Sequence, residues 1–242
     1  LIPRFGVRAE RRREASIFSA SVAYEFSLPG ATSVDQQELL ELGRVRPDDA
    51  WDVVRWNLGY SFYLEPLFAG GYTRGKTSLA HELALSFRGQ YAMNDRLIPT
   101  EEQVAGGLYS VRGYRESATA ADTVLLATAE YRFHLPRAFE PTENDTTLFG
   151  ERFRYAPASP GGRPDWDLIG RAFVDWGRTV NSKIEDQFEK DEDLLSTGLG
   201  LEFVYRQNLS VRVDWGMALS DLESPKIDSG SSRIHFVATI LY

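Results

Sequence analysis

The residues best placed for specific chemistry are an arginine and an aspartate that lie far apart in the sequence. Arg112 lies in a glycine-interrupted stretch, and Asp175 lies in a later segment of alternating polarity. The planar guanidinium group matches a carboxylate in parallel hydrogen bonds, which are strongest where water is scarce. We therefore expect this pair to hold a loop against a wall of the protein rather than to catalyse a reaction.

The residues around Asp175 favour a buried partner over a solvated surface arginine. Within residues 166–178, Phe173, Asp175 and Gly177 share one face with Arg171. The opposite face is mostly apolar and consists of Trp166, Leu168, Gly170, Ala172, Val174 and Trp176. If the face of Asp175 points into the interior of the protein, an inward-folded loop brings Arg112 to it.

The elements that must position this pair are β-strands, because polar and apolar residues alternate along most of the chain. Several alternating segments run for ten residues or more, whereas strands of soluble sheets usually have about 5–6 residues. Residues 209–219 alternate most regularly. The pattern predicts about nine strands, at residues 2–10, 18–28, 56–65, 79–91, 123–135, 166–178, 195–205, 209–219 and 233–242.

Alternation alone does not distinguish a soluble β-sandwich from a membrane barrel, which turns its apolar face to lipid and its polar face inward. Strand length, aromatic residues at strand ends and the pattern of connections favour the barrel. No apolar run reaches the roughly 18 residues of a membrane-spanning helix. We predict an all-β fold, an antiparallel transmembrane β-barrel. The sandwich remains the alternative, and it predicts expression without detergent.

The connections between these strands alternate in length, as they do in membrane barrels. Short connections are expected at residues 11–14, 70–78 and 206–208, and long polar ones at 29–52, 96–122, 180–193 and 220–232. The long connection 136–164 breaks this alternation, and we expect a small hairpin or a plug there. Because single-chain bacterial barrels usually have an even number of strands, nine strands suggest that residues 1–242 are the C-terminal portion of a larger barrel.

Composition excludes several other classes of protein. The chain has no cysteine, so a disulfide framework, a thiolate metal site and a cysteine nucleophile are absent. A net charge of −8 argues against nucleic acid as a partner, because binding phosphates requires a basic surface. Residues 70–77 fit the phosphate-binding loop pattern literally, but the strand-and-helix context that this motif requires is missing. His81, His134 and His235 lie on separate strands, so no cofactor and no metal is expected.

The motifs resemble those of one family. Residues 106–114, with the tetrapeptide Val111, Arg112, Gly113 and Tyr114, are similar to the tip of a loop in the Omp85 superfamily of outer-membrane translocators and insertases. The stretch with Phe173, Asp175 and Gly177 resembles the barrel-wall motif that receives this loop, and Ala129–Phe133 resembles the strand that leaves it. Within the superfamily, residues 102–116 are most similar to the two-partner secretion transporters, the TpsB or hemolysin activator proteins.

This resemblance implies a barrel of about sixteen strands, of which the chain supplies the C-terminal nine or so. It implies that Arg112 anchors the loop to Asp175, with Phe173 and Gly177 shaping the wall, Gly113 permitting the turn and Tyr114 packing the tip. The implied function is export of a secreted polypeptide partner across the outer membrane of a Gram-negative-type bacterium. An insertase for membrane-inserted polypeptides and a passive porin-like barrel remain the alternatives.

The end of the chain carries a further expected signal. Ile234, Phe236, Ala238, Ile240 and Tyr242 alternate with polar or small residues up to a terminal aromatic side chain. This pattern resembles the signal by which the outer-membrane assembly machinery recognises its substrates, and we assign Phe236, Ile240 and Tyr242 to it. The other interpretation is a domain that simply ends in a strand.

Overall fold

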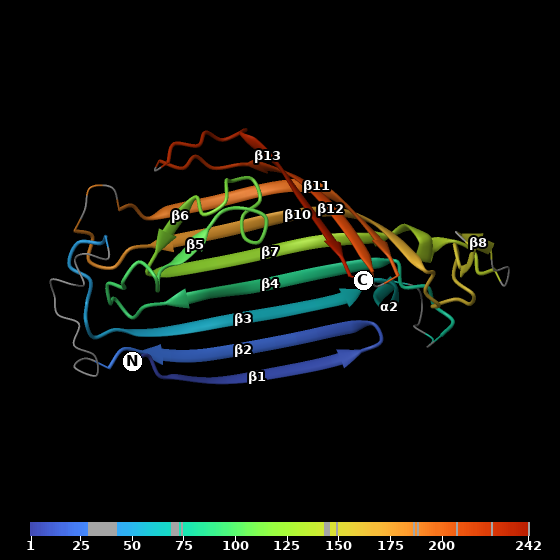
Figure 1. The fold of residues 1–242 in the computed structure, drawn as a ribbon, viewed down its shortest axis with the longest axis horizontal. Coiled ribbons are helices and arrows are strands. Elements are labelled where there is room, and N and C mark those ends of the chain that lie inside the picture. Colours follow the sequence, from blue (N-terminus) through green and yellow to red (C-terminus); the bar gives the residue numbers. More distant parts are fainter. Residues whose placement is uncertain are drawn as a thin grey trace.

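Nine long antiparallel strands form one large sheet in the computed structural model of the chain (Figure 1). Each strand pairs with the next long strand in sequence, so the sheet is a meander. Its strands are β1 (Arg4–Arg13), β2 (Ser16–Phe26), β3 (Asp52–Tyr63), β4 (His81–Tyr91), β7 (Thr123–His134), β10 (Trp166–Val180), β11 (Glu192–Tyr205), β12 (Leu209–Ala218) and β13 (Ser232–Ile240). The predicted all-β, antiparallel fold and its nine strands are therefore confirmed.

The remaining described elements are short. The strands β5 (Gln103–Ala105) and β6 (Thr119–Ala121) pair with each other, as do β8 (Thr146–Leu148) and β9 (Glu151–Phe153). Single turns of helix occur at α2 (Glu65–Phe68) and η1 (Leu135–Ala138). The structure describes residues 1–28, 43–68, 73, 75–142, 146–148, 150–185, 187, 189–206, 208–223 and 225–241.

The two faces of the large sheet are inverted relative to those of a soluble protein. One face, which we call the outer face, exposes large apolar side chains, such as Phe5 (67% exposed) and Ile234 (73% exposed). Buried and charged side chains, including Asp175 and Glu130, lie on the opposite, inner face. Successive side chains of a strand point to opposite faces, so the alternation in sequence becomes an apolar exterior. The face assignment expected for residues 166–178 agrees with the register of β10 and β7.

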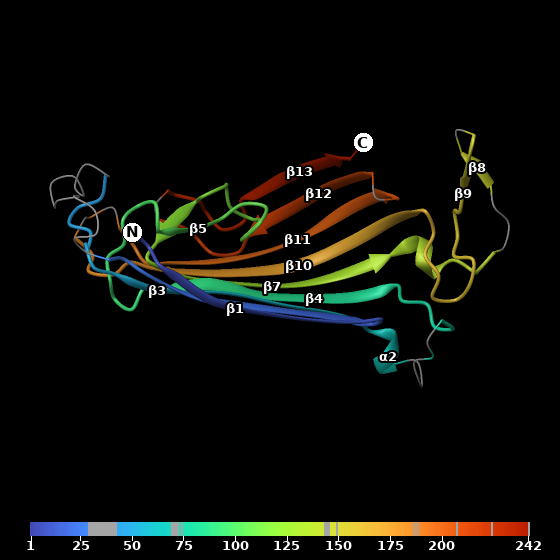
Figure 2. The same ribbon diagram turned by 60° about the horizontal axis from the view of Figure 1, so that its bottom comes forward.

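A soluble sandwich is not what the described residues form. A sandwich buries the apolar face of one large sheet against another, and the other sheets in the described part of the chain are two-stranded hairpins. Figure 2 shows that β12 and β13 curl towards the side on which β5 lies, as expected of the wall of a barrel. Among the described residues, no helix is long and apolar enough to cross a membrane.

The connections follow the predicted alternation only in part, since the connection between β3 and β4, expected to be short, is longer than the one between β10 and β11, expected to be long. The connection expected at residues 11–14 is shorter, because Arg11–Arg13 continue β1 and pair with β2. The connection expected at 70–78 is longer, since β3 ends at Tyr63 and β4 begins at His81. Half of the literal phosphate-loop pattern, Gly70, Gly71, Tyr72 and Arg74, lies outside the described residues. The long connection after β7 contains the small hairpin β8–β9, at the opposite end of the molecule from the N-terminus (Figure 1).

The sheet is open in the part of the chain that the structure describes. β1 pairs with β2 alone, and β13 pairs with β12 alone. Each of these strands therefore presents one edge of backbone N–H and C=O groups without a strand partner among the described residues. Such edges are covered or paired in stable proteins.

Candidate functional site

The glycine-interrupted stretch forms a loop that lies on the inner face of the sheet. Its base is the hairpin of β5 and β6, in which Gln103 pairs with Ala121 and Ala105 pairs with Thr119. We call residues 106–118, between these two strands, the inserted loop. Gly106 and Gly107 have φ values of +107° and +95°, which side chains other than glycine rarely adopt. The reversal at these glycines directs the loop back over the sheet.

The tip of the inserted loop places Arg112 against Asp175. Nε and Nη2 of Arg112 each donate a hydrogen bond of 2.8 Å to the two carboxylate oxygens of Asp175. The backbone N–H of Arg112 donates a third, at 3.1 Å. The side chain of Arg112 is 3% exposed and that of Asp175 is fully buried. The structure thus brings together the two residues that the sequence singled out.

Two further carboxylates complete the site, and sequence reasoning did not assign them. Nη1 of Arg112 donates to Glu130 at 2.6 Å and to Asp214 at 3.2 Å. Glu130 lies on β7 and Asp214 on β12, so one arginine joins the loop to three strands. Both residues occupy inner-face positions of alternating strands, and this was the available signal in the sequence.

Other arginines balance the charge of these carboxylates. Glu130 also accepts hydrogen bonds from Arg132 at 2.7 Å and from Arg171, while Asp214 accepts one from Arg212 at 2.9 Å. Removing one partner of a buried ion pair costs about 3–5 kcal/mol, because the other charge is left without compensation. The arrangement can therefore fix the position of the loop. It holds charges in place.

The residues of β10 and β12 that surround Arg112 leave room for the loop tip. The guanidinium carbon of Arg112 lies 3.3 Å from the centre of the Phe173 ring, and the planar cation stacks on the aromatic face. A Cβ at Gly177 would lie 3.0 Å from the side chain of Val111. At Gly216 a Cβ would lie 2.7 Å from the backbone of Arg112, closer than real Cβ contacts. The glycine of β12 is therefore required for the loop tip to reach the wall.

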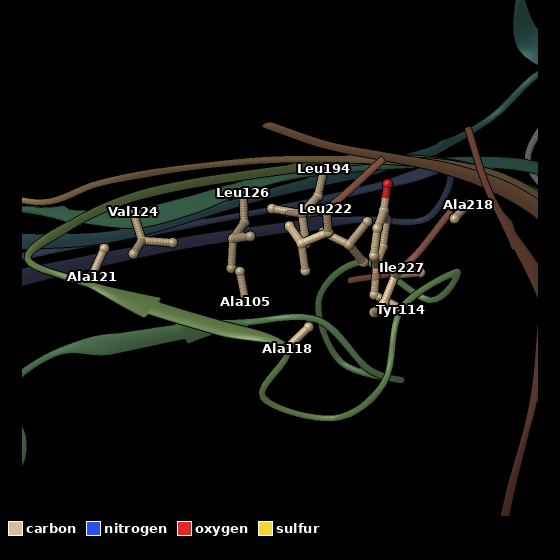
Figure 3. Packing of buried hydrophobic residues seen from close by; sticks show 11 residues of the cluster. Ala105, Tyr114, Ala118, Ala121, Val124, Leu126, Leu194, Ala218, Leu222 and Ile227 are labelled. Atoms are coloured by element: carbon tan, nitrogen blue, oxygen red, sulfur yellow. The ribbon is translucent and has the colours of Figure 1, made fainter. Parts of the chain in front are cut away.

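We call the residues that hold Arg112, namely Asp175, Glu130, Asp214 and Phe173, the seat of Arg112. The rest of the tetrapeptide packs beside it. Val111 and Tyr114 are fully buried, and they belong to an apolar cluster that joins the loop to β7, β11 and the β12–β13 connection (Figure 3). The hydroxyl of Tyr114 donates to the carbonyl of Ser220 at 2.7 Å. At Gly113 a Cβ would lie 2.6 Å from the backbone N of Ala218. Close backbone approach, rather than positive φ, explains this glycine.

The last strand, β13, contacts Arg112 and carries the residues of the expected assembly signal. His235 of β13 donates from Nε2 to the carbonyl of Arg112 at 2.8 Å. Phe236 and Ile240 lie on the outer face and are largely exposed. Tyr242 lies outside the described residues. The role of these three positions in assembly stays a prediction.

A second buried ionic group, which the sequence did not reveal, ties the long connections together. We call Arg44, Arg96, Asp122 and Glu189 the loop cluster. Arg44 donates to Asp122 at 2.9 Å and to Glu189 at 2.9 Å, and Arg96 donates to both oxygens of Glu189 at 2.6 and 2.7 Å. Its members come from three connections, so no local pattern could have indicated it.

The protonation of the carboxylates near the loop cluster is perturbed. Burial alone would raise the pKa of Glu189, but hydrogen bonds from Arg96 and Arg44 lower it below its ordinary value. Burial raises the pKa of the neighbouring Glu102, and Arg44 offsets this effect in part. The cluster thus requires Glu189 to be ionised.

Solved structures of two proteins superpose on almost the whole chain. CdiB from Acinetobacter baumannii superposes with a TM-score of 0.58 and 18% identity, over 99% of this chain and 33% of that one. CdiB from Escherichia coli superposes with a TM-score of 0.65 and 13% identity, over 98% of this chain and 36% of that one. The chain therefore spans about a third of the length of the CdiB chains.

Comparisons of sequence find less than the comparison of structures. No protein-family model matches the chain, and no curated protein matches it. At identities below 20% the likeness to CdiB, a TpsB-family transporter, concerns the fold. The resemblance expected from the motifs is confirmed at the level of the fold, which this chain shares with the CdiB structures.

Proposed function

We propose that this chain forms part of an outer-membrane barrel that exports a partner polypeptide, as two-partner secretion transporters do. The observation that supports this proposal best is the seat of Arg112, which joins the inserted loop to Asp175, Glu130 and Asp214 within a CdiB-like fold. A passive barrel needs no such buried ionic seat. In the proposed activity no covalent bond is made or broken, so the site residues position a loop and do not catalyse.

The open sheet and its apolar exterior support an incomplete barrel in a lipid bilayer. Within a bilayer core, backbone groups at a sheet edge have no water to bond, so stable spanning sheets are closed. The free edges of β1 and β13 therefore call for further strands. We propose that residues 1–242 are the C-terminal portion of the barrel. Its exposed apolar face would contact outer-membrane lipid, and β13 would be read by the outer-membrane assembly machinery.

The proposal is tested in the full-length, membrane-embedded protein with single changes at the seat. Arg112→Lys keeps the positive charge but loses the planar fork, and Asp175→Asn keeps the shape but loses the charge. Secretion of the candidate partner polypeptide is measured together with heat-modifiable migration, which reports barrel folding. Arg115→Lys is the matched control, because Arg115 lies in the same loop and is exposed.

The expected result is a loss of secretion of tenfold or so in both seat variants, with a folded barrel and a normal Arg115→Lys control. The exchange variant Arg112→Asp with Asp175→Arg should secrete less of the partner polypeptide than the parent does, because Glu130 and Asp214 would then face an added carboxylate. Parental secretion in both single variants would contradict the role of the Arg112 ion pairs in export and would remove the observation that favours an exporter over a passive barrel.

A further inference from the structure

The inner face of β1, β2 and β3, which we call the open wall, carries an excess of arginine. Arg4, Arg8 and Arg12 lie at alternate inner positions of β1, and Arg55 lies on the same face of β3. The described inner positions of these three strands carry four arginines and two glutamates, Glu10 and Glu25. The whole chain has a net charge of −8, so this wall inverts the sign of the protein.

Arg8 and Arg12 are available for a ligand, in contrast to Arg112. Arg4 pairs with Glu25 at 3.2 Å, and Arg55 pairs with Glu25 at 3.4 Å and with Glu101 at 2.7 Å. The side chains of Arg8 and Arg12 are 77% and 75% exposed. Their carboxylate neighbour on the strand is the same residue, Glu10, which lies 3.6 Å from Arg8 and also bonds Arg12. One glutamate therefore serves two arginines and leaves an uncompensated positive charge.

The floor between the arginines is built from small residues. A groove of about 600 Å³ runs over the wall. Its lining includes Arg4, Arg8 and Arg55 together with Gly6, Ser19 and Ser21. Small side chains let a backbone approach the sheet closely, while the arginines project beyond it. The inserted loop seats on β7, β10 and β12 and leaves this groove uncovered.

We propose that the open wall is a track for extended, acidic segments of the exported polypeptide. This proposal rests on the proposed export function and specifies the chemistry of its substrate. Inner arginines four residues apart on β1 are spaced by about 13 Å. An extended peptide running along β1 would present every fourth side chain at the same interval. Asp or Glu at those positions would meet Arg4, Arg8 and Arg12 in turn.

The ion pairs expected at this site would let a polypeptide pass along the wall rather than hold it there. Contacts between exposed arginines and carboxylates are individually weak and are screened by salt. Several such contacts along a wall of one sign would attract and orient an acidic chain without trapping it. Basic segments would be repelled by the same wall. Charge pattern, rather than side-chain shape, would then decide which segments move fastest.

Two short peptides test this inference on the full-length protein in a planar lipid bilayer. One carries Glu at every fourth position of an uncharged, flexible 13-residue sequence, and the other carries Lys at the same positions. Block of the open-channel current is measured at low and at high salt for the parent and for the double variant R8Q/R12Q. The double variant R11Q/R13Q is the matched control, because Arg11 and Arg13 lie on the outer face of the same strand.

The expected result is that the Glu peptide blocks the parent at a tenfold lower concentration than the Lys peptide does, on the order of what several weak pairs supply. R8Q/R12Q should remove most of this difference, R11Q/R13Q should keep it, and high salt should abolish it. Equal block by the two peptides, or an unchanged difference in R8Q/R12Q, would overturn the inference. The anion-to-cation permeability ratio, which R8Q/R12Q should lower, provides a readout without any peptide.

Failure of this inference can be told apart from failure of the export function. If seat variants lose secretion but the peptides are not distinguished, export stands and the acidic track is wrong. If the peptides are distinguished but the seat variants secrete normally, the acidic track stands and the role of Arg112 and Asp175 in export is wrong.

Discussion

The two halves of the inner face use arginine in opposite ways. On β7, β10 and β12, Arg112 is buried beneath the inserted loop and bonded to three carboxylates. On β1, Arg8 and Arg12 are largely exposed and share one glutamate. Buried pairs cost much to break, whereas exposed pairs contribute little to stability. The half formed by β7, β10 and β12, which we call the covered half, therefore holds a segment of its own chain. The open wall is left free.

Arg112→Ala should cause the largest effect on the covered half. It leaves Asp175, Glu130 and Asp214 buried without their shared cation, so we expect the seated loop to lose about 3–5 kcal/mol. Limited proteolysis within residues 106–118 measures release of the loop. Arg115→Ala is the control and should change the cleavage rate little. Equal cleavage of the two variants would mean that the ionic seat does not hold the loop.

Gly216→Val tests the shape of the same seat without changing a charge. A side chain there would meet the backbone of Arg112, where even a Cβ would be at 2.7 Å, so we expect the loop tip to be displaced at a cost of several kcal/mol. The same proteolysis assay measures the displacement. Gly170→Val is the control, since a Cβ at Gly170 meets no atom within 4 Å. A protected loop in Gly216→Val would show that the wall can yield.

Tyr114→Phe should have a smaller effect on the covered half. The change removes the hydroxyl that bonds the Ser220 carbonyl at 2.7 Å, while the ring stays in its apolar cluster. We expect a loss of about 1–2 kcal/mol in the stability of the seated loop. Hydrogen exchange of the loop amides measures it. An effect as large as that of Arg112→Ala would contradict the view that the ion pairs dominate.

Sequence patterns predicted Arg112 and its first partner, Asp175, but not its further partners. The alternation of β10 placed Asp175 on the inner face, and the glycines around Arg112 indicated an inward loop. Glu130 and Asp214 were not predicted as partners of Arg112, because each is one polar residue among many on an alternating strand. The alternation shows the face on which a residue lies, but the register that brings Glu130, Asp175 and Asp214 beside one arginine depends on pairing across β7 to β12.

The loop cluster could not have been predicted for a related reason. Its arginines and carboxylates come from three irregular connections, where no period constrains the positions of side chains. Arg11–Arg13 show a smaller failure, since a charged run indicated a turn where the chain continues as strand. Charges at the end of a barrel strand can lie at the membrane surface, so charge alone does not end a strand.

The loop cluster predicts a dependence on pH. Because the pKa of Glu189 is lowered in the folded protein, its contribution is present above the ordinary glutamate value of 4.5 and is lost as pH falls through the lowered pKa. Glu102, whose pKa is raised, has the opposite sign and favours the folded loops at low pH. We expect faster hydrogen exchange in residues 92–102 in acid. Glu189→Gln should exchange fast already at neutral pH, and Glu140→Gln, at an exposed position, should match the parent.

The smallest effect on stability is expected on the open wall. Arg8→Ala removes a side chain that is 77% exposed and whose ion pair with Glu10 spans 3.6 Å, so unfolding should shift by less than about 0.5 kcal/mol. The midpoint of heat-modifiable migration of the full-length protein measures this shift beside Arg112→Ala. A cost close to that of Arg112→Ala would mean that Arg8 is buried against strands beyond β1, and the open wall would then be a second covered one. A negligible cost combined with a reduced preference of the channel for anions would separate the two uses of arginine, since only a residue that is free in the resting protein can contribute to selectivity without contributing to stability.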